Sequence, residues 1–455
     1  MASPTSNSVP VTAYNISSLA SAARYLAAGT KWGGALGTGV NLTYSIPTGT
    51  ASFISPYSST NEWSSWYALD SAEAAGVRLA LSQISKFVNI NFTQVTDNSS
   101  TVGELRFAQT SQMGSGEVAH AYLPRSHPSA GDVWMNISEF NTDGGGVPLG
   151  SYDFHTLLHE IGHALGLKHS FSSPNAMPAS RDNYFYTIMS YSASPYSDSD
   201  YATFYPTTPM YYDLLALQAI YGRRSNVNTG NDVYTFLDGK HYWETINDGG
   251  GSNDLIVYKG VEATTINLNP GGFSSLSERI YFSTGSSKAT VTIGPGVVIE
   301  HATGGSGNDI IVGNSANNVL RGLAGGDRIS GGVGNDNIFG GPGGDTLNGG
   351  AGRDIFTFDS ALGSSNVDRI VDFSRVDDTI RLENSIFTAV GAVGALAAYA
   401  FRAGAAAADS NDRIIYNASN GILTYDANGN AAGGAVHFAI LATGLTLTAA
   451  DFFVV

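Results

Sequence analysis

Three histidines and a glutamate in one short segment are the residues of this chain best suited to chemistry. The segment reads His155-Thr-Leu-Leu-His159-Glu160-Ile-Gly-His163-Ala-Leu-Gly166-Leu-Lys-His169. His159 and His163 are four residues apart, so on a helix they share one face and their imidazoles converge. Gly166 permits a sharp turn that returns His169 as a third ligand. Three neutral imidazoles that leave a fourth position open are a ligand set of catalytic zinc.

Glu160 follows the first of these histidines directly. That position predicts a carboxylate that acts on a water molecule rather than on the metal, the role of a general base. HExxH alone is short enough to occur by chance, whereas the extended H-E-x-x-H-x-x-G-x-x-H pattern is far more specific. His155 shares the helical face, but we interpret it as a neighbour and not a ligand. The histidines without ligand spacing are expected to be structural: His120, His127, His241, His301 and His437.

A methionine lies downstream in the segment Thr187-Ile-Met189-Ser-Tyr191. A lone methionine in an apolar run is ordinarily a core residue. After an extended zinc motif, however, Met189 predicts a turn that supports the metal from below. Tyr191, which taken alone would be a surface tyrosine, is then expected to bring its phenol to the metal or to a developing oxyanion.

The remaining patterns of the first half predict a mixed α/β unit. Alternating apolar residues indicate half-buried strands at residues 40–46, 87–95 and 104–108. Helical spacing of apolar residues indicates helices at 71–84, about 154–167 and about 209–221. Ser151 and Asp153 are candidate caps of the second helix, and Gly222 ends the third.

Residues 304–357 are a repeat, which reads GGSGNDIIV, GNSANNVLR, GLAGGDRIS, GGVGNDNIF, GGPGGDTLN and GGAGRDIFT. The sixth positions are Asp309, Asn318, Asp327, Asp336, Asp345 and Asp354. This is the nonapeptide signature of a calcium-binding parallel β-roll, in which two repeats complete a coil and turns on one side lie 18 residues apart. A flexible Gly-rich linker is the alternative, but a linker does not keep an acidic residue in a strict frame. Because Asn318 brings no charge, we expect its site to bind calcium more weakly, and without calcium the region is expected to be disordered.

Composition excludes several classes of protein. The 455 residues favour two domains, and a formal charge of −16 argues against nucleic-acid or anionic-membrane binding while favouring hard cations. The absence of cysteine excludes disulfides and thiolate chemistry. The longest apolar run, residues 389–401, is too short to span a bilayer. No Lys or Arg precedes Arg24 and no apolar run follows, so no N-terminal secretory signal is expected.

An extended zinc motif, a methionine turn and a nonapeptide β-roll in that order resemble the serralysins, a family of bacterial secreted zinc metalloproteases of the metzincin type. Further matching segments are 213–222, 266–269, 298–300 and 451–455. The resemblance implies an α+β metzincin protease domain at residues 1–222, followed by an all-β parallel β-roll/β-sandwich domain at 223–455. The segment before about residue 30 matches little, and residues 1–20 are expected to be a pro-segment or an extension. The acidic and apolar terminus 451–455 resembles the signal that type I secretion machinery reads.

The resemblance also implies the site residues. Zinc would be held by His159, His163 and His169, with Glu160 as base, Tyr191 as electrophilic partner and Met189 in the supporting turn. Substrate would lie extended against an edge strand at residues 118–123, contacting Ala119, Ala121 and Leu123. Calcium would be bound at turn positions two, four and six of the repeats: Gly305, Gly307, Asp309, Asn314, Ala316, Asn318, Leu323, Gly325, Asp327, Gly332, Gly334, Asp336, Gly341, Gly343, Asp345, Gly350, Gly352 and Asp354. Outlying calcium candidates are Asn228, Gly230, Asp232, Asp248, Gly250, Asp254, Glu300 and Asp368.

The function implied is that of a secreted, monomeric zinc- and calcium-dependent endopeptidase of broad specificity, with one catalytic Zn²⁺ and several structural Ca²⁺. Its partners would be protein and peptide substrates, the type I secretion machinery and a proteinaceous inhibitor. The alternative is a calcium-loaded extracellular binding or adhesion protein whose zinc domain is inactive. A β-roll lipase would need a G-x-S-x-G elbow, which the sequence lacks. Two departures from the family are Ser170, where serralysins usually carry proline, and shifted residues in the segment 228–254.

Overall fold

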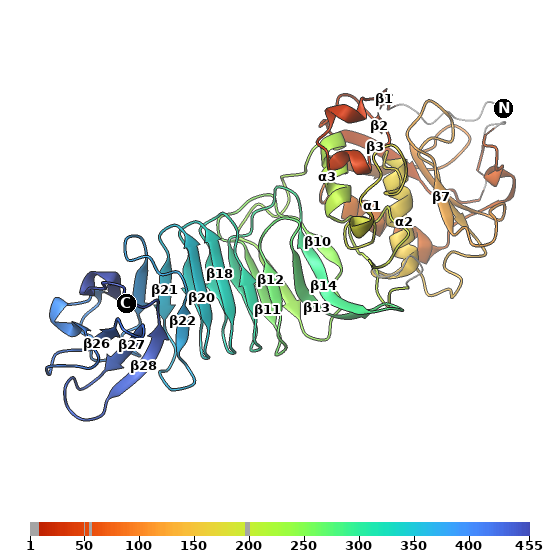
Figure 1. The fold of residues 1–455 in the computed structure, drawn as a ribbon. Helices are drawn as coiled ribbons and strands as arrows, with labels where there is room; N and C mark the ends of the chain where they lie inside the picture. The colour runs from red at the N-terminus through yellow and green to blue at the C-terminus, as the bar shows by residue number, and fades with distance from the viewer. Residues whose placement is uncertain (1–8, 50, 54–56, 196–200) are drawn as a thin grey trace. The chain divides into compact units, whose positions relative to one another are not determined.

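The computed structural model describes residues 9–49, 51–53, 57–195 and 201–455 and divides into two units (Figure 1). The first unit contains the chain up to Val227 together with His241–Gly249 and Arg279–Pro295. The second contains Asn228–Lys240, Gly250–Glu278 and Gly296–Val455. The expected single boundary between residues 222 and 223 therefore needs correction. One reason is that β10 (Glu244–Ile246) and β14 (Ser286–Ile293) pair in parallel inside the first unit.

The first unit is built on a six-stranded sheet. Its order is β5-β3-β6-β8-β7, and β4 pairs with β6 beside that path. Strands β3, β5, β6 and β8 run parallel to one another, whereas β7 is antiparallel to β8 and β4 is antiparallel to β6. β7 is the last strand in this order and forms one edge. The strands are β3 (Val40–Ser45), β4 (Trp66–Tyr67), β5 (Ile90–Gln94), β6 (Leu105–Thr110), β7 (Ala119–Ala121) and β8 (Val133–Asn136).

A separate pair of strands holds the beginning of the described chain. β1 (Val11–Ala13) pairs antiparallel with β2 (Thr30–Trp32). Residues 11–13 of the expected pro-segment or extension are thus part of the folded unit, while residues 1–8 of it lie outside the described residues. Short 3-10 helices in this unit are η1 (Ile16–Ser18), η2 (Ala23–Tyr25), η3 (Glu62–Ser65) and η4 (Ala179–Arg181).

The described residues of this unit form three α-helices: α1 (Ser71–Ser85), α2 (Tyr152–Ala164) and α3 (Tyr211–Tyr221). Helices α1 and α2 pack against the sheet, and α3 packs against η2. In α1, the Asp70 carboxylate accepts the backbone N–H groups of Ala72 and Glu73. At the start of α2, Ser151 Oγ accepts the N–H of Phe154, so Ser151 is the cap and Asp153 lies in the first turn. The apolar side chains of α2 are fully buried, which fixes the helix and the face that carries its histidines: Phe154, Leu157, Leu158 and Ile161.

The second unit contains two nine-stranded sheets, with the orders β24-β29-β23-β21-β19-β17-β15-β11-β9 and β12-β16-β18-β20-β22-β28-β27-β26-β25. The first sheet contains β9 (Val233–Leu237), β11 (Leu255–Lys259), β15 (His301–Thr303), β17 (Val319–Arg321), β19 (Asn337–Phe339), β21 (Ile355–Phe358), β23 (Thr379–Leu382), β24 (Gly394–Ala395) and β29 (Phe452–Val454). The second contains β12 (Thr265–Asn267), β16 (Ile310–Val312), β18 (Arg328–Val333), β20 (Thr346–Ala351), β22 (Asp368–Ile370), β25 (Phe401–Ala403), β26 (Ile414–Asn417), β27 (Ile422–Asp426) and β28 (Ala435–Ile440). The unit also has η5 (Ala398–Ala400) and η6 (Ala449–Asp451), and β13 (Phe273–Tyr281) runs across the division.

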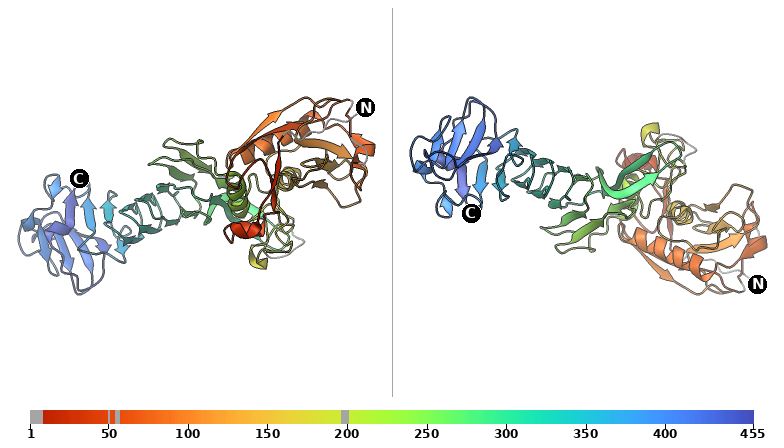
Figure 2. Two further views of the ribbon diagram at one scale, coloured as in Figure 1. Left: turned by 90° about the horizontal axis from the view of Figure 1, so that it is seen from above. Right: turned by 90° about the horizontal axis from the view of Figure 1, so that it is seen from below.

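Successive nonapeptides alternate between these two sheets, and the resulting coils are visible in Figure 2. In the parallel register Ile311 pairs with Ile329, and Ile329 pairs with Leu347, so the coil repeats every 18 residues, as predicted. One apolar side chain per repeat strand points inward and is at most 2% exposed: Ile311, Leu320, Ile329, Ile338, Leu347 and Phe356. The fold class of an α+β unit followed by an all-β unit of parallel sheets is thereby confirmed.

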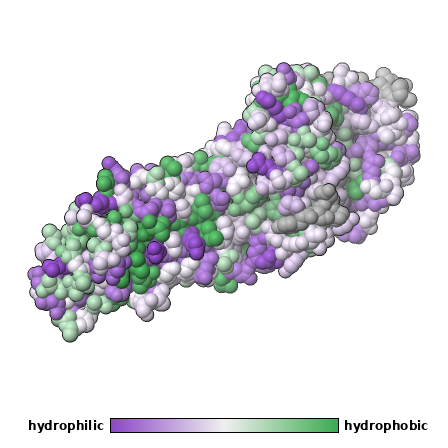
Figure 3. Space-filling view, in the orientation of Figure 1, coloured by the Kyte–Doolittle hydropathy of each residue, from purple (hydrophilic) through white to green (hydrophobic). Residues whose placement is uncertain are grey.

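Within the described residues, no helix has the length and apolarity needed to cross a membrane. The apolar run at 389–401 instead contains β24 and η5. On the face drawn in Figure 3, hydrophilic and hydrophobic residues are interspersed.

Candidate zinc centre and active site

Helix α2 and the turn after it place the three histidines. His159 and His163 lie one helical turn apart on α2, and the helix ends at Ala164 rather than near residue 167 as expected. Gly166 has a φ of +98°, and a Cβ there would collide with the carbonyl oxygen of Thr30. A side chain at this position would therefore both strain the backbone and clash, so the turn that leads to His169 requires glycine.

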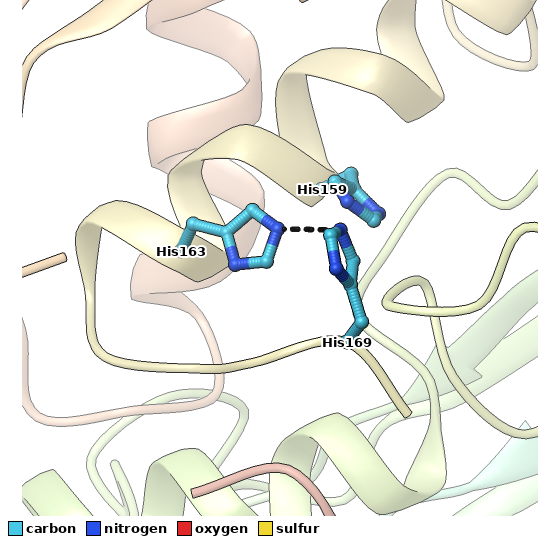
Figure 4. A group of neighbouring side chains, drawn as sticks. All are labelled: His159, His163 and His169. Atoms are coloured by element: carbon cyan, nitrogen blue, oxygen red, sulfur yellow. Dashed lines mark hydrogen bonds between the residues drawn. The ribbon is translucent and has the colours of Figure 1, made fainter. Parts of the chain in front are cut away.

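The three imidazoles converge on one point, as Figure 4 shows. One nitrogen from each ring lies within 4.8 Å of the others, and the Nε2 atoms of His163 and His169 are 3.0 Å apart. The Nδ1 atoms of His159 and His163 lie 2.7 Å and 2.8 Å from the carbonyl oxygens of Ile188 and Leu167. A carbonyl only accepts, so Nδ1 carries the proton and Nε2 presents its lone pair to the centre.

The protonation of these rings also suits a cation. Burial lowers the pKa of His163 to about 4, and it lowers the pKa values of His159 and His169 as well. The rings are therefore neutral at pH 7, which is the form that binds metal. His159 Nε2 is buried without a hydrogen-bond partner among the described residues. Three converging ring nitrogens, one of them without a hydrogen-bond partner among the described residues, fit a zinc ion with an open fourth position.

Glu160 lies beside this centre and lines the same cavity. Its side chain is buried, and its Oε2 atom has no hydrogen-bond partner within the described part of the chain. Burial raises the pKa of the Glu160 carboxyl to about 8. A bound divalent cation would lower this pKa, because it stabilises the nearby negative charge. The carboxylate is placed to exchange a proton with a water in the cavity.

The methionine turn packs directly beneath α2. Met189 is fully buried, and a Cβ on Gly162 of α2 would lie 2.6 Å from its Sδ atom. Asp213 of α3 fixes the turn: its carboxylate accepts Thr187 Oγ1 at 2.6 Å and the Ile188 N–H at 2.8 Å. Since the Ile188 carbonyl holds His159, Asp213 acts on the centre through this turn. Sequence reasoning missed this role, although a lone carboxylate at the start of an otherwise apolar helix was a signal.

Ser170 connects the third histidine to the same turn. Its backbone N–H donates to the Met189 carbonyl at 3.2 Å, and its hydroxyl lies 3.1 Å from that oxygen. Proline has no N–H and could not make the first of these bonds. The departure from the family pattern therefore comes with two contacts that tie His169 to the methionine turn.

Tyr191 is close to the centre, as the resemblance implied. Its phenol oxygen lies 2.8 Å from His169 Nε2, and its side chain is 61% exposed. Phe171, which sequence reasoning did not single out, stacks on the His169 ring with centroids 4.9 Å apart and planes at 11°. The Tyr191 hydroxyl is thus held at the open side of the centre.

A cavity of about 740 Å³ opens beside the three histidines. One wall is the edge strand β7 with its flanks, including Ala119, Ala121 and Leu123. The opposite wall is α2, where His155 lines the cavity and is not part of the converging histidine cluster. Among the described residues β7 pairs with β8 alone, so its outer edge can accept an extended chain next to the centre.

The other histidines lie apart from the converging cluster. His120 hydrogen-bonds to Glu62 and Glu117, both at 2.8 Å. His127 bonds to Ser129, His301 to Asn253 and the Val319 N–H, and His437 to Thr424, while His241 stacks on Phe204.

The sixth-position side chains of the repeats form two ladders inside the second unit. All six are about 1% exposed. On one side the N–H of Asp309 donates to Asp327, whose N–H donates to Asp345. On the other side Asn318 donates to Asp336, whose N–H donates to Asp354. Each of these bonds uses Oδ1 of the acceptor, so the second oxygen of each carboxylate remains for another partner.

Those second oxygens are unsatisfied at the four carboxylates that accept a ladder bond. The Oδ2 atoms of Asp327, Asp336, Asp345 and Asp354 are buried and have no hydrogen-bond partner among the residues described. Buried carboxylate oxygens of this kind fit a hard cation. From the third repeat onward, the residues at the predicted second and fourth turn positions have positive φ. Leu323 is the first of them, with a φ of 71°, and the others are glycines: Gly325, Gly332, Gly334, Gly341, Gly343, Gly350 and Gly352.

The first two repeats differ from the rest. The Asp309 Oδ2 atom accepts the Gly305 N–H at 2.6 Å. The Asn318 amide donates to the Glu300 carbonyl at 2.8 Å and to Asn314 at 3.1 Å. Hydrogen bonds therefore occupy the positions that are unsatisfied in later repeats. Gly307 and Ala316 also belong to these two turns.

The outlying candidates extend the ladders in the second unit. Asp345 donates its N–H to Asp368, and Asp354 donates to Asp378, which sequence reasoning missed. Upstream, the Asp232 N–H donates to Asp254 and the Asp254 N–H donates to Glu300. The Oδ2 atoms of Asp232 and Asp254 are buried without a partner among the described residues. Asn228, Gly230 and Gly250 belong to the same unit, whereas Asp248 belongs to the first.

Comparison with known proteins agrees with this architecture. Residues 212–454 match the family profile described as Peptidase M10 serralysin C terminal, and residues 57–190 match the profile Matrixin. Serralysin of Photorhabdus luminescens is 33% identical over 276 residues, covering 55% of this chain and 54% of that protein. Serralysin C of Dickeya chrysanthemi is 34% identical over 314 residues, covering 62% and 60%. Metallopeptidase AprA of Pseudomonas marginalis is 30% identical over 298 residues, covering 60% of each chain. The chain thus spans between half and two thirds of the length of these relatives.

Proposed function

The chain belongs to the serralysin family of M10 peptidases, and on that premise we propose that it is a zinc-dependent endopeptidase that hydrolyses peptide bonds of extracellular proteins. The observation that carries the proposal is the convergence of three neutral imidazoles beside a buried glutamate in a cavity bordered by an edge strand. Peptidase names among the relatives disfavour the alternative of a binding protein with an inactive zinc domain.

His159, His163 and His169 would hold the ion. Bound there, zinc supplies Lewis-acid polarisation of the scissile carbonyl and makes a nearby water more acidic. Glu160 takes the proton of the attacking water, because its carboxylate lines the cavity beside the three histidines and has an oxygen, Oε2, without a hydrogen-bond partner among the described residues. The same carboxyl then gives the proton to the leaving amine, since the nitrogen must be protonated before it departs.

Tyr191 supports the developing oxyanion by donating its phenol hydrogen. Its hydroxyl is held 2.8 Å from His169 Nε2 at the open side of the centre, within reach of a bound carbonyl. Hydrogen-bond donors placed where charge develops contribute more to the transition state than to the substrate complex.

Substrate selection through β7 would be broad. An extended peptide that pairs with the outer edge of β7 is bound through its backbone, which every sequence shares. Ala119, Ala121 and Leu123 line the cavity there with small or apolar side chains. Proteins with accessible extended segments are therefore the expected substrates.

Calcium ions are proposed as structural cofactors of the second unit. The unsatisfied Oδ2 atoms of Asp327, Asp336, Asp345 and Asp354 support ions between successive turns, with backbone carbonyls of the glycine positions as further ligands. Asp232, Asp254, Glu300 and Asp368 support additional ions at the ends of the ladders. Asp248 is also proposed as a calcium ligand.

The proposal includes secretion by type I machinery that reads residues 451–455. A monomer that a proteinaceous inhibitor can bind is also part of it. The family membership supports these points. Secretion is tested by measuring export of the full chain and of a chain that lacks residues 451–455.

The test of the enzymatic role is the substitution Glu160→Gln, which keeps the shape of the side chain but removes the base. We expect hydrolysis of a fluorogenic peptide to fall by roughly 10²- to 10⁴-fold, while zinc content stays at one ion per chain. The matched control is Glu383→Gln in the second unit, which should leave hydrolysis unchanged. Hydrolysis that survives Glu160→Gln at the original rate would refute Glu160 as the base.

A further inference from the structure

The cavity continues along α2 beyond the zinc centre, and His155 lines this extension together with Tyr152, Thr156 and Tyr184. His155 precedes His159 by one helical turn on the same face, which separates the two by roughly 6 Å along the axis. Successive residues of an extended peptide are roughly 3.3 Å apart, so the long side chain of a residue next to the scissile bond can span the remaining distance. A peptide whose scissile carbonyl lies at the zinc centre therefore brings the side chain of an adjacent residue to His155.

His155 is polar but is not satisfied by its surroundings. The residue is 2% exposed, and its Nδ1 atom is sealed without a hydrogen-bond partner among the described residues. Its Nε2 atom is not among the solvent-inaccessible atoms and makes no hydrogen bond to the described part of the chain. Because His155 lines the cavity, Nε2 is the ring nitrogen that a ligand in the cavity can reach. A neutral imidazole offers one donor and one acceptor. Leaving such a group unpaired away from water is costly, because its hydrogen bonds to water are lost and not replaced.

The surroundings of His155 are aromatic. Its ring lies 4.1 Å from that of Tyr184 and 5.9 Å from that of Tyr205, measured between centroids. Tyr184 and Tyr205 are both buried. Burial lowers the pKa of His155 to about 3, so the ring stays neutral over the working range of the protein. Such buried aromatic surroundings disfavour a charged side chain and accept a flat neutral one.

We propose that His155 is a specificity-determining residue that hydrogen-bonds an uncharged polar side chain, such as that of tyrosine or glutamine, next to the scissile bond of the substrate. This inference rests on the proposed peptidase function and adds a side-chain preference to the backbone recognition by β7. A site built to pair a polar group discriminates against the analogue that lacks it, because its own polar atom is then left unpaired.

The experiment measures kcat/KM on two peptide series that differ at the residue before or after the scissile bond. Each series contains the matched pairs Tyr/Phe and Gln/Met. We expect a preference for the polar member on the order of 10-fold at one of the two positions, corresponding to about 1.4 kcal/mol. In His155→Phe this preference should disappear, whereas His155→Gln, which can still hydrogen-bond, should retain part of it. His437→Phe in the second unit is the matched control and should keep the preference of the unsubstituted chain.

The outcomes separate the two proposals. Cleavage by the unsubstituted chain with equal rates for both members of every pair would overturn the role of His155 and leave the peptidase function standing. An unchanged polar preference in His155→Phe would also overturn it. Absence of all cleavage in the zinc-loaded chain would contradict the peptidase function and the inference with it. Zinc content of each variant, measured in parallel, shows that the centre itself is intact.

Discussion

At the scale of single residues, the spacing of the histidines was sufficient to predict that the imidazoles of His159, His163 and His169 converge. The separation of four between His159 and His163 determines their shared face on any helix. The carbonyl groups that orient those rings could not be predicted, because Ile188 reaches His159 only through tertiary packing of the methionine turn. The lone carboxylate of Asp213 at the start of an apolar helix was a local signal, but its partner, the Ile188 N–H, is known only from the folded chain.

Tyr191 gives a prediction at this scale. In Tyr191→Phe the three imidazoles remain, so zinc content should not change. We expect kcat for a fluorogenic peptide to fall on the order of 10²-fold with little change in KM, because the lost donor acts mainly on the transition state. Steady-state kinetics on the purified variant provides the check, and an unchanged kcat would mean that the phenol has no part in the reaction.

At the scale of elements, the ends of the three expected helices and of the strands expected at 40–46, 87–95 and 104–108 lie within a few residues of those in the structure. Periodicity and caps are local signals, so they could be recognised in the sequence. The support of β7 was not predictable. Glu62, in η3, is fully buried and hydrogen-bonds to His120 of β7 and to Tyr122 just beyond it. Partners so distant in sequence meet only when the sheet has formed.

This network predicts a pH dependence of stability. Burial alone would raise the pKa of Glu62, but hydrogen bonds from His120, Ser58, Thr60 and Tyr122 outweigh it and lower the pKa to about 2. Because the folded pKa lies below the unfolded value of 4.5, the contribution of Glu62 is present above pH 4.5 and is lost as the pH falls towards 2. A lowering of this size corresponds to roughly 3 kcal/mol.

The pKa of His120 shifts in the opposite direction. Burial alone would lower this pKa, but the bonds to Glu62 and Glu117 outweigh burial and raise the pKa above 6.5. The contribution of His120 to stability is therefore lost as the pH rises beyond that value.

The measurement is urea unfolding of the unsubstituted chain and of Glu62→Gln at several pH values, followed by tryptophan fluorescence. All five tryptophans, at positions 32, 63, 66, 134 and 243, belong to the first unit, so the signal reports that unit alone. We expect the difference in stability between the two proteins to shrink as the pH falls from 5 to 2. Loss of zinc at low pH is common to both and cancels in this comparison. A difference that does not vary with pH would contradict the assignment.

At the scale of the whole molecule, the nonapeptide frame was enough to predict the stacked coils of the second unit, because a repeat of fixed length imposes one register. The division between the units was not predictable from composition. Residues 241–249 and 279–295 return to the first unit, where β10 and β14 pair, and no local signal marks such a return.

Removal of calcium should destabilise the second unit. Without ions the buried carboxylates repel one another, and binding stabilises the folded state by mass action. We expect a calcium chelator to lower the midpoint of thermal unfolding measured by far-UV circular dichroism, and added calcium to restore it. In Asp336→Asn the ladder acceptor Oδ1 remains but the unsatisfied Oδ2 is lost, so more calcium should be needed. The exposed Asp409→Asn is the control. Equal calcium requirements in the two variants would argue against an ion at Asp336.

The central claim, that one zinc ion held by His159, His163 and His169 drives hydrolysis, is tested most directly by titrating the metal while peptide cleavage is followed. We predict that activity falls in proportion to the zinc removed by a selective chelator and returns in full when one equivalent per chain is added back. Cleavage that continues in zinc-free protein, or a chain that carries one zinc ion at this centre and cleaves no peptide, would contradict the account.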